Sequence, residues 1–240
     1  MLGAAACAAA LMGPGPSSAS PFQVDSTGTA EEVELKSTLE YRDSSSKETW
    51  IAPKLAVTFP VTERLEFEVA TGYRQVERDG VTHEGLGDST LELKWRVLDE
   101  TPSGVALAVI PELSLPTGSE SRGLGAGDAV LVVPMVVEKH LGSVTLAGEV
   151  GYGRSFEGGE DFVPVGVLIT VQPRDALKIG VEIAGEAPAD QFSDCELSAN
   201  AGFKWKATPR VEIHGLAGRS VRSPDSAPTT RFKLVAEVRL

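Results

Sequence analysis

The stretch from Gly85 to Gly118 contains two arms with a period of two, and the alternation of apolar and polar residues is strict in the first. Its first arm sets Leu91, Leu93, Trp95 and Val97 against the charged residues between them. This period of two is typical of a strand with one apolar and one polar face. A turn over 99–104 leads to a second alternating arm over 105–115. Each arm has about ten residues, a length typical of membrane-spanning strands, whereas soluble strands usually have about five or six.

The same alternation recurs along the chain and predicts twelve strands, an even number. We expect them near residues 32–41, 51–59, 65–74, 89–97, 105–115, 128–138, 144–152, 162–171, 177–183, 196–206, 211–214 and 231–240. The strand at 128–138 differs from the others because it is apolar on both faces. Short turns near 60, 99, 139, 172 and 207 alternate with mostly longer, polar loops near 42, 75, 117, 155, 186 and 220. This asymmetry is typical of bacterial outer-membrane barrels with both termini on the periplasmic side. The expected fold class is therefore all-β, an antiparallel, up-and-down transmembrane β-barrel of about 12 strands.

Aromatic residues fall near the ends of the predicted strands, where barrels place girdles at the two membrane interfaces. Those near the loops are Tyr41, Trp50, Tyr73, Tyr152, Phe162 and Phe232, and those near the turns are Phe59, Trp95, Phe203 and Trp205. A soluble β-sandwich would hold large aromatics at mid-strand. Prolines also lie inside predicted strands, at positions 53, 111, 134 and 164. Because proline lacks a backbone donor, we expect bulges or local breaks there.

Composition narrows the function. The 240 residues carry a net charge of -12, which argues against binding a nucleic-acid backbone. No window of about eighteen consecutive apolar residues predicts a membrane-spanning helix after the leader. The mean hydropathy of -0.02 suits both a soluble protein and a barrel. Cys195 is alone after the leader, so no internal disulfide is expected, and one cysteine is too few for a structural metal site. We expect no metal and no cofactor.

The start of the chain predicts export. Residues 1–19 have the small, apolar composition of a secretory signal that lacks its positive n-region, with cleavage after Ala19; a disordered, alanine-rich tail is the alternative. Residues 20–30 are expected as a polar spacer and 31–240 as the barrel domain. The expected location is the bacterial outer membrane, with lipid, lipopolysaccharide and the barrel-assembly machinery as partners. Acidic loop residues could bind divalent cations between lipopolysaccharide groups, or be ordinary solvated charge.

Four segments carry a family resemblance. They are Gly85-Leu86-Gly87-Asp88 before a strand that ends Lys94-Trp95-Arg96, the run from Pro111 to Gly118, Gly125-Ala126-Gly127-Asp128, and Glu149-Val150-Gly151-Tyr152 in a later strand. The chain resembles, over roughly residues 30–240, the family of outer-membrane transporters named for the meta-pathway of phenol degradation. The motif residues are Gly87, Asp88, Pro116, Thr117 and Gly118, of which Pro-Thr-Gly is the most specific. The resemblance implies a channel or transporter for small, hydrophobic or aromatic compounds, and it carries over no catalytic residue. The C-terminal Leu240 departs from the terminal aromatic common in such barrels.

The alternation also predicts which charged residues point into the barrel. They are Glu66, Glu68, Glu92, Lys94, Arg96, Glu112, Glu149, Lys178, Glu182, Lys204, Glu212, His214 and Arg231. They could line a pore and set its selectivity, or they could form a packed network of mutually neutralising charges that closes the barrel. A twelve-strand barrel is wider than the eight-strand barrels that side chains can fill, so some lumen is expected. The mixed signs indicate no strong preference for one ion charge.

No enzyme site emerges from the sequence. Gly87-Asp88-Ser89 resembles a hydrolase nucleophile block, but no Asp-x-x-His and no Gly-x-Ser-x-Gly motif accompanies it. The three histidines fall in a loop, a turn and a strand, and they indicate no catalytic triad. The predicted function is a channel or transporter for small molecules. The alternatives are a non-transporting structural or adhesive barrel and a soluble periplasmic β-sandwich that binds ligands.

Overall fold

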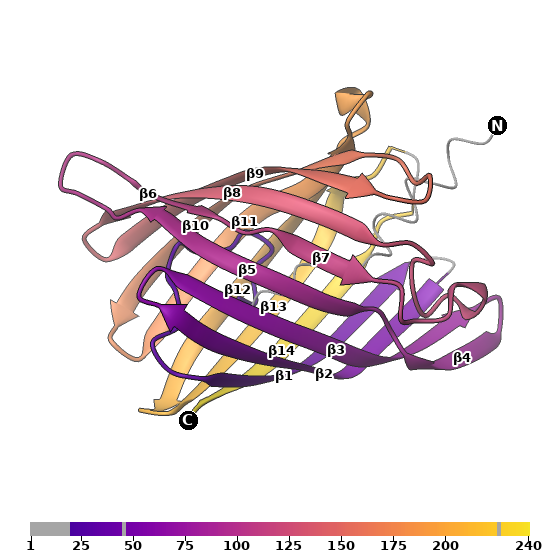
Figure 1. The fold of residues 1–240 in the computed structure, drawn as a ribbon, viewed down its shortest axis with the longest axis horizontal. Coiled ribbons are helices and arrows are strands. Elements are labelled where there is room, and N and C mark those ends of the chain that lie inside the picture. The colour runs from indigo at the N-terminus through magenta and orange to yellow at the C-terminus, as the bar shows by residue number, and fades with distance from the viewer. Residues whose placement is uncertain (1–19, 45–46, 225–226) are drawn as a thin grey trace.

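The computed structural model describes residues 20–44, 47–224 and 227–240 (Figure 1). Residues 1–19, on which the secretory signal is predicted, lie outside the described residues. The strands are β1 (Glu34–Ser44), β2 (Lys47–Thr62), β3 (Leu65–Arg78), β4 (Val81–Leu86), β5 (Ser89–Leu98), β6 (Ala106–Val109), β7 (Glu112–Leu115), β8 (Val130–Leu141), β9 (Val144–Ser155), β10 (Phe162–Arg174), β11 (Leu177–Pro188), β12 (Glu196–Thr208), β13 (Val211–Arg222) and β14 (Thr230–Arg239). Two short 3-10 helices, η1 (Glu120–Arg122) and η2 (Phe192–Asp194), also belong to this part of the chain. Within it, no helix has the length and hydropathy needed to cross a membrane.

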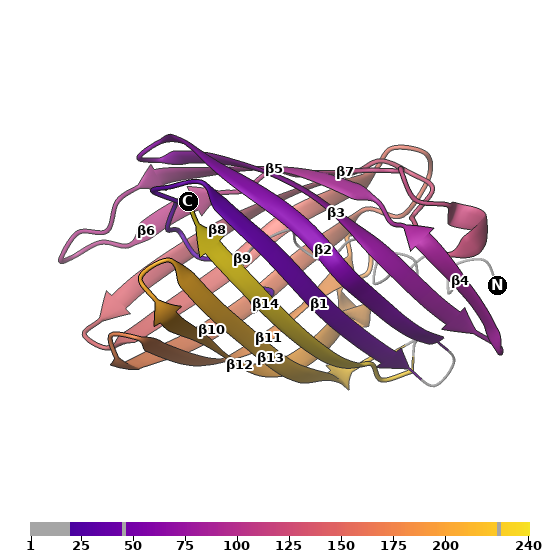
Figure 2. The same ribbon diagram turned by 90° about the horizontal axis from the view of Figure 1, so that it is seen from below.

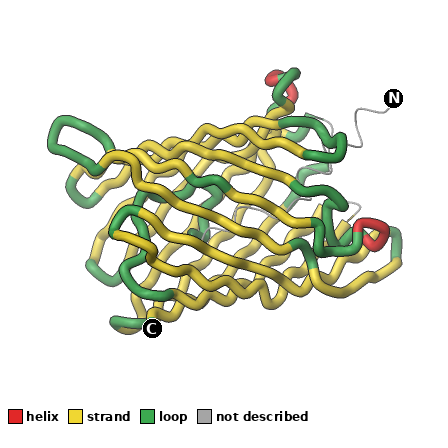
Figure 3. Tube along the Cα trace, in the orientation of Figure 1, coloured by secondary structure: helices red, strands yellow, loops and turns green. Residues whose placement is uncertain are grey.

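The strands form one closed antiparallel barrel. Neighbours in sequence pair with each other, and β1 pairs with β14 from Glu34 opposite Arg239 to Asp43 opposite Thr230, which closes the sheet (Figure 2). Two of the twelve barrel strands are interrupted, one as β4 and β5 and the other as β6 and β7. The predicted twelve-strand meander is therefore confirmed. Both short helices and most of the longer loops lie at one end, here called the loop end, whereas the C-terminus and the projecting β5–β6 loop lie at the opposite turn end (Figure 3).

The segment from Gln75 to Gly85 is a β-hairpin, and our prediction of a polar loop there was wrong. Strand β3 continues to Arg78 and pairs with β4 in unbroken register. Asp79 and Gly80 connect them with φ angles of 53° and 76°. Positive φ at both central residues is what a two-residue type I′ hairpin turn requires. The Asp-Gly pair was thus the local signal for this hairpin.

The prolines interrupt pairing much as predicted. The pairing of β2 shifts register around Pro53, and Pro111 separates β6 from β7. The ladder between β9 and β10 skips Pro164. Pro134 differs, because β8 pairs with β9 without interruption there. Its other side faces the break between β6 and β7, where its carbonyl accepts the Ile110 N–H at 2.9 Å.

Outward side chains give the barrel an apolar belt. At mid-strand, Val167 and Val181 are 59% and 56% exposed. A soluble domain rarely exposes so continuous an apolar surface, whereas lipid covers it in an outer-membrane barrel. Part of the aromatic girdle is a cluster at the loop end, in which the Tyr41 ring lies 4.5 Å from that of Trp50 and 6.4 Å from that of Phe232. Belt and girdle are those of a barrel in the bacterial outer membrane.

The turn between β5 and β6 is fixed by Glu100. The Lys139 ammonium lies 3.0 Å from one carboxylate oxygen, and His140 Nδ1 lies 2.6 Å from the other. The hydrogen bonds from Lys139, and then those from His140, lower the pKa of Glu100 to about 2. This turn thus depends on an ionised carboxylate.

Candidate functional site

The start of the described chain lies inside the barrel. Residues 20–30, expected as a polar spacer before the barrel domain, occupy its lumen and are called the luminal segment here. Six of its side chains are at most 5% exposed, and they are Ser20, Pro21, Phe22, Val24, Asp25 and Thr27. The segment runs toward the turn end, where Thr29 Oγ1 donates to the carbonyl of Glu63 at 2.8 Å. The lumen is therefore occupied at mid-height.

Phe22 holds the luminal segment by an apolar contact. Its ring forms a buried cluster with Val24 and inward side chains of four strands, which are Ala147, Leu168, Ala184 and Leu216. The ring packs onto Gly180 and Gly202, which lie opposite each other on β11 and β12. A Cβ at Gly180 would lie 2.8 Å from the ring, and a Cβ at Gly202 would lie 3.0 Å from it. Because both residues are glycine, the ring can rest directly on the barrel wall.

Carboxylates of the barrel accept the backbone donors of the luminal segment. The N–H groups of Gln23 and Val24 donate to Glu182 at 3.0 and 3.1 Å. The N–H of Asp25 donates to Glu149 at 3.0 Å. A buried backbone donor without a partner would cost about 1–3 kcal/mol, so these inward carboxylates compensate for the absence of strand pairing.

Side-chain contacts complete the attachment. The Lys94 ammonium lies 3.1 Å from the Asp25 carboxylate, and both groups are buried. Glu138 accepts a hydrogen bond from Thr27 Oγ1 at 3.1 Å. Glu66 accepts the N–H of Ala30. The luminal segment is thus bound along its length by polar groups on several strands.

The thirteen predicted inward residues fall into overlapping groups. Those that contact the luminal segment are Glu66, Lys94, Glu149 and Glu182. Those that line the cavity described below are Glu92, Glu112, Glu149 and Arg231. The remainder lie toward the turn end, and they are Glu68, Arg96, Lys178, Lys204, Glu212 and His214. A role as pore lining stays a prediction for all of them.

Paired charges occupy the turn-end half of the lumen. Lys36 on β1 lies 2.9 Å from Glu68 and 3.2 Å from Glu34. Arg239 Nη2 lies 2.6 Å from Glu212. This half corresponds to the neutralising network that the sequence left open as an alternative to a pore. The loop-end half of the lumen instead contains a cavity.

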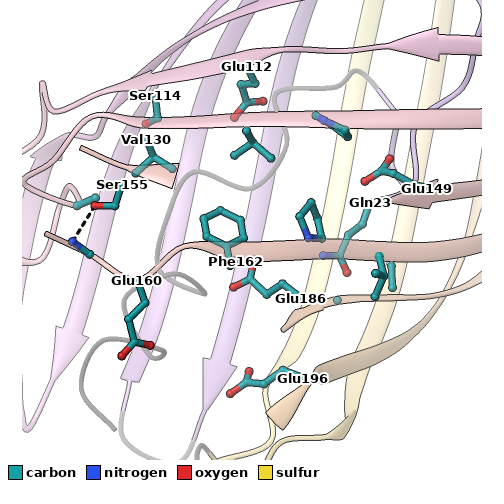
Figure 4. A pocket seen from close by; sticks show the side chains of 18 of the residues that line it. Gln23, Glu112, Ser114, Val130, Glu149, Ser155, Glu160, Phe162, Glu186 and Glu196 are labelled. Atoms are coloured by element: carbon teal, nitrogen blue, oxygen red, sulfur yellow. Dashed lines mark hydrogen bonds between the residues drawn. The ribbon is translucent and has the colours of Figure 1, made fainter. Parts of the chain in front are cut away.

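A cavity of about 510 Å³ lies on the loop-end side of the luminal segment (Figure 4). We call it the loop-end cavity. One wall of it is apolar, formed by Ile110, Val130, Val132, Pro134, Phe162, Pro164 and Val165. Most of these residues come from β8 and β10, and β8 is the strand predicted to be apolar on both faces. Phe162, expected in the outer girdle, lines this cavity and does not face lipid.

The charged lining of the loop-end cavity is mainly acidic. Among the described residues, ten acidic side chains contribute to it, namely Asp25, Glu92, Glu112, Glu120, Asp128, Glu149, Glu157, Glu160, Glu186 and Glu196, against two basic ones, Arg42 and Arg231. The sequence indicated no preference between ion charges, so this excess of one sign is a difference from expectation. Glu186 was missed because we placed it in an acidic loop, whereas β11 continues to Pro188. The spacing of Glu182, Ala184 and Glu186 carried that signal.

The residues that carry the sequence resemblance shape the loop at the rim of the cavity. The Asp88 carboxylate accepts the N–H of Gly118 at 2.9 Å and that of Ala126 at 2.7 Å. Thr117 Oγ1 donates to the carbonyl of Gly87 at 3.1 Å. A Cβ at Gly118 would lie only 2.8 Å from a backbone oxygen, so this close crossing of two chain segments requires glycine. The motif therefore has a structural role in the loop that carries part of the cavity lining.

Comparison with known proteins identifies solved structures that share this fold. No family model matches the sequence, and no curated protein does. Among solved structures, the chain is similar to the COG4313 outer membrane channel from Pseudomonas putida F1, with a TM-score of 0.65 and 15% identity over 90% of this chain and 100% of that one. It is also similar to the KdgM porin in complex with disordered oligogalacturonate (TM-score 0.59, 9% identity, 86% and 99% covered) and to the NanC porin (0.60, 6%, 86% and 100%). The chain therefore has the fold of the bacterial outer-membrane channel barrels.

Proposed function

We propose that the protein is an outer-membrane channel for small molecules, closed by the luminal segment in the arrangement described above and opened by displacement of that segment. The observation that carries the proposal is the division of the lumen. A cavity of about 510 Å³ at the loop end, within the size range of small-molecule sites, ends on a segment that no strand pairing holds. Each attaching contact described above involves a side chain of the barrel or of the segment, so the segment can leave without breaking the barrel's hydrogen-bond ladder.

The substrates we propose are small hydrophobic or aromatic compounds. The apolar wall around Phe162 supports this choice, because flat apolar molecules gain most from contact with such a surface. The resemblance to the meta-pathway family points the same way, although no family model matches the chain.

A non-transporting barrel is the second candidate, and the occupied lumen favours it. Conductance in planar bilayers separates the two. We expect the folded protein to give discrete steps, and deletion of residues 20–28 to raise the open fraction strongly. Charge reversal of Glu92 or Glu112 should change the ion selectivity of the steps. Heat-modifiable migration serves as the control for folding. If the folded deletion variant shows no steps, the channel proposal is wrong and the non-transporting barrel remains.

A further inference from the structure

We propose that the loop-end cavity selects small organic cations, in which an ammonium or similar positive group is attached to an apolar or aromatic body. This inference rests on the proposed function, because it names the substrate class of the same channel. It follows from the arrangement of carboxylates, from a buried hydroxyl and from the apolar wall between them.

Two pairs of carboxylates face each other across neighbouring strands of the cavity. Glu92 lies directly opposite Glu112 in the register of β5 and β7, and Glu186 lies directly opposite Glu196 in that of β11 and β12. Like charges at opposed positions destabilise a sheet. A cation bound between such residues reduces their repulsion. The free energy of repulsion that binding relieves then adds to the affinity for the cation.

The two arginines of the lining are too few to offset this excess, and they share one carboxylate that lies outside the lining. Arg42 Nε lies 2.6 Å from the Glu40 carboxylate, and Arg231 Nε lies 3.5 Å from the same group. Glu40 is not part of the cavity lining. The described lining therefore has an excess of acidic over basic side chains, which favours positive ligands.

A buried hydroxyl gives a second, independent indication of a ligand. Ser114 lines the cavity two residues from Glu112 on β7, and its side chain is 3% exposed. Among the described residues, its Oγ has no hydrogen-bond partner. Buried polar atoms normally have a partner, and each exception calls for an explanation. An ammonium N–H donated to this oxygen would satisfy it.

The apolar wall lies between the two carboxylate pairs. Figure 4 shows Phe162 between Glu112 and Ser114 on one side and Glu186 and Glu196 on the other. An aromatic face attracts a cation and also contacts an apolar body. A ligand that is both apolar and positively charged uses the wall and the carboxylates together, whereas an anion meets repulsion and a neutral compound gains no charge attraction from the carboxylates.

The test compares three probes that share one ring. Benzylammonium, benzyl alcohol and benzoate are titrated by calorimetry or saturation-transfer NMR into the folded protein in non-ionic detergent. We expect benzylammonium to bind about tenfold or more tightly than either of the others. The double variant Glu186→Gln/Glu196→Gln should lose about tenfold of that affinity and keep the affinity for benzyl alcohol.

A matched control keeps the net charge change but moves it outside the cavity. Glu77→Gln/Glu84→Gln alters two exposed residues of the β3–β4 hairpin, neither of which lines the cavity. Exposed charges contribute little, so benzylammonium affinity should stay within about twofold of wild type. Heat-modifiable migration shows whether each variant is folded. If the Glu186→Gln/Glu196→Gln variant does not fold, the single variant Ser114→Ala is measured instead. It should weaken benzylammonium binding severalfold and leave benzyl alcohol binding unchanged.

Equal affinity for benzylammonium and benzyl alcohol overturns the inference. So does an equal loss in the hairpin control, which would assign the effect to general surface charge. The binding measurement needs no conductance, so the two proposals can fail separately. Tight benzylammonium binding by a protein silent in bilayers would refute the channel alone, and a conducting protein without charge preference would refute the cation inference alone.

Discussion

Truncation of Phe22 to alanine should release the luminal segment from the barrel. The Phe22 side chain is 1% exposed and rests on Gly180 and Gly202, while a displaced segment would expose the ring to water in the lumen. Burial of a phenylalanine side chain stabilises by about 1.5–3 kcal/mol, and the cavity left by truncation raises the measured cost to about 3–5 kcal/mol. A loss of about 3 kcal/mol changes the ratio of docked to displaced segment by about a hundredfold.

Single-channel recording measures this ratio as the open fraction. If displacement of the luminal segment opens the lumen, Phe22→Ala should shorten the closed intervals or lengthen the open ones, with a combined effect that approaches the hundredfold estimated above. Phe192→Ala is the matched control, because Phe192 is 58% exposed on η2. The barrel ladder is unchanged in both variants, so heat-modifiable migration should match wild type. An unchanged open fraction in Phe22→Ala, or an equal rise in the control, would refute the idea that this ring holds the channel closed.

Three further changes test other contacts. Lys94→Met removes the ammonium 3.1 Å from the buried Asp25 carboxylate, a loss of about 3–5 kcal/mol for a buried ion pair, and should raise the open fraction; unchanged recordings would show that this pair does not hold the segment. Asp88→Ala removes the acceptor of two backbone N–H groups, at about 1–3 kcal/mol each, so limited proteolysis should cut within 119–127 much faster than in wild type, and equal rates would contradict the proposed role of the motif. Glu100→Gln should loosen the turn after β5 in a pH-dependent way. Because the pKa of Glu100 is lowered from the usual 4.5 to about 2, its stabilising contribution is complete above pH 4.5 and is lost as the pH falls toward 2. Amide exchange in this turn should thus be faster in the variant at pH 7 and equal near pH 2, and a difference that persists at pH 2 would exclude this origin.

The barrel could be predicted from sequence because its information is local. Each strand alternates lipid-facing and inward side chains, so the period of two, the even strand number and the unequal links together specify a meander. Strand β8 departs from this alternation because it is apolar on both faces, and it supplies part of the apolar wall of the cavity. The hairpin at Asp79-Gly80 was equally local, and there the turn signal was overlooked.

The luminal segment could not be predicted in the same way because its contacts are long-range. The hydrogen bond from Asp25 to Glu149 spans 124 positions, and that from Gln23 to Glu182 spans 159. A short segment that pairs with no strand leaves no periodic pattern to read, apart from Phe22 and Val24 at alternate positions. Alternation therefore predicts which side chains point inward, but not whether an inward carboxylate contacts the segment, lines a cavity or pairs with a neighbouring base.

Closure and selectivity use the same residues in the proposed channel. Asp25 belongs to the luminal segment and also lines the loop-end cavity, and Glu149 both accepts the Asp25 N–H and lines that cavity. A cation in the cavity would compete with Lys94 for Asp25 and with the segment's backbone for Glu149. A ligand shifts a conformational equilibrium only by the difference between its affinities for the two states. A cation that gains contacts to these carboxylates once the segment has left would thus promote its own passage, whereas a neutral compound of the same size would not.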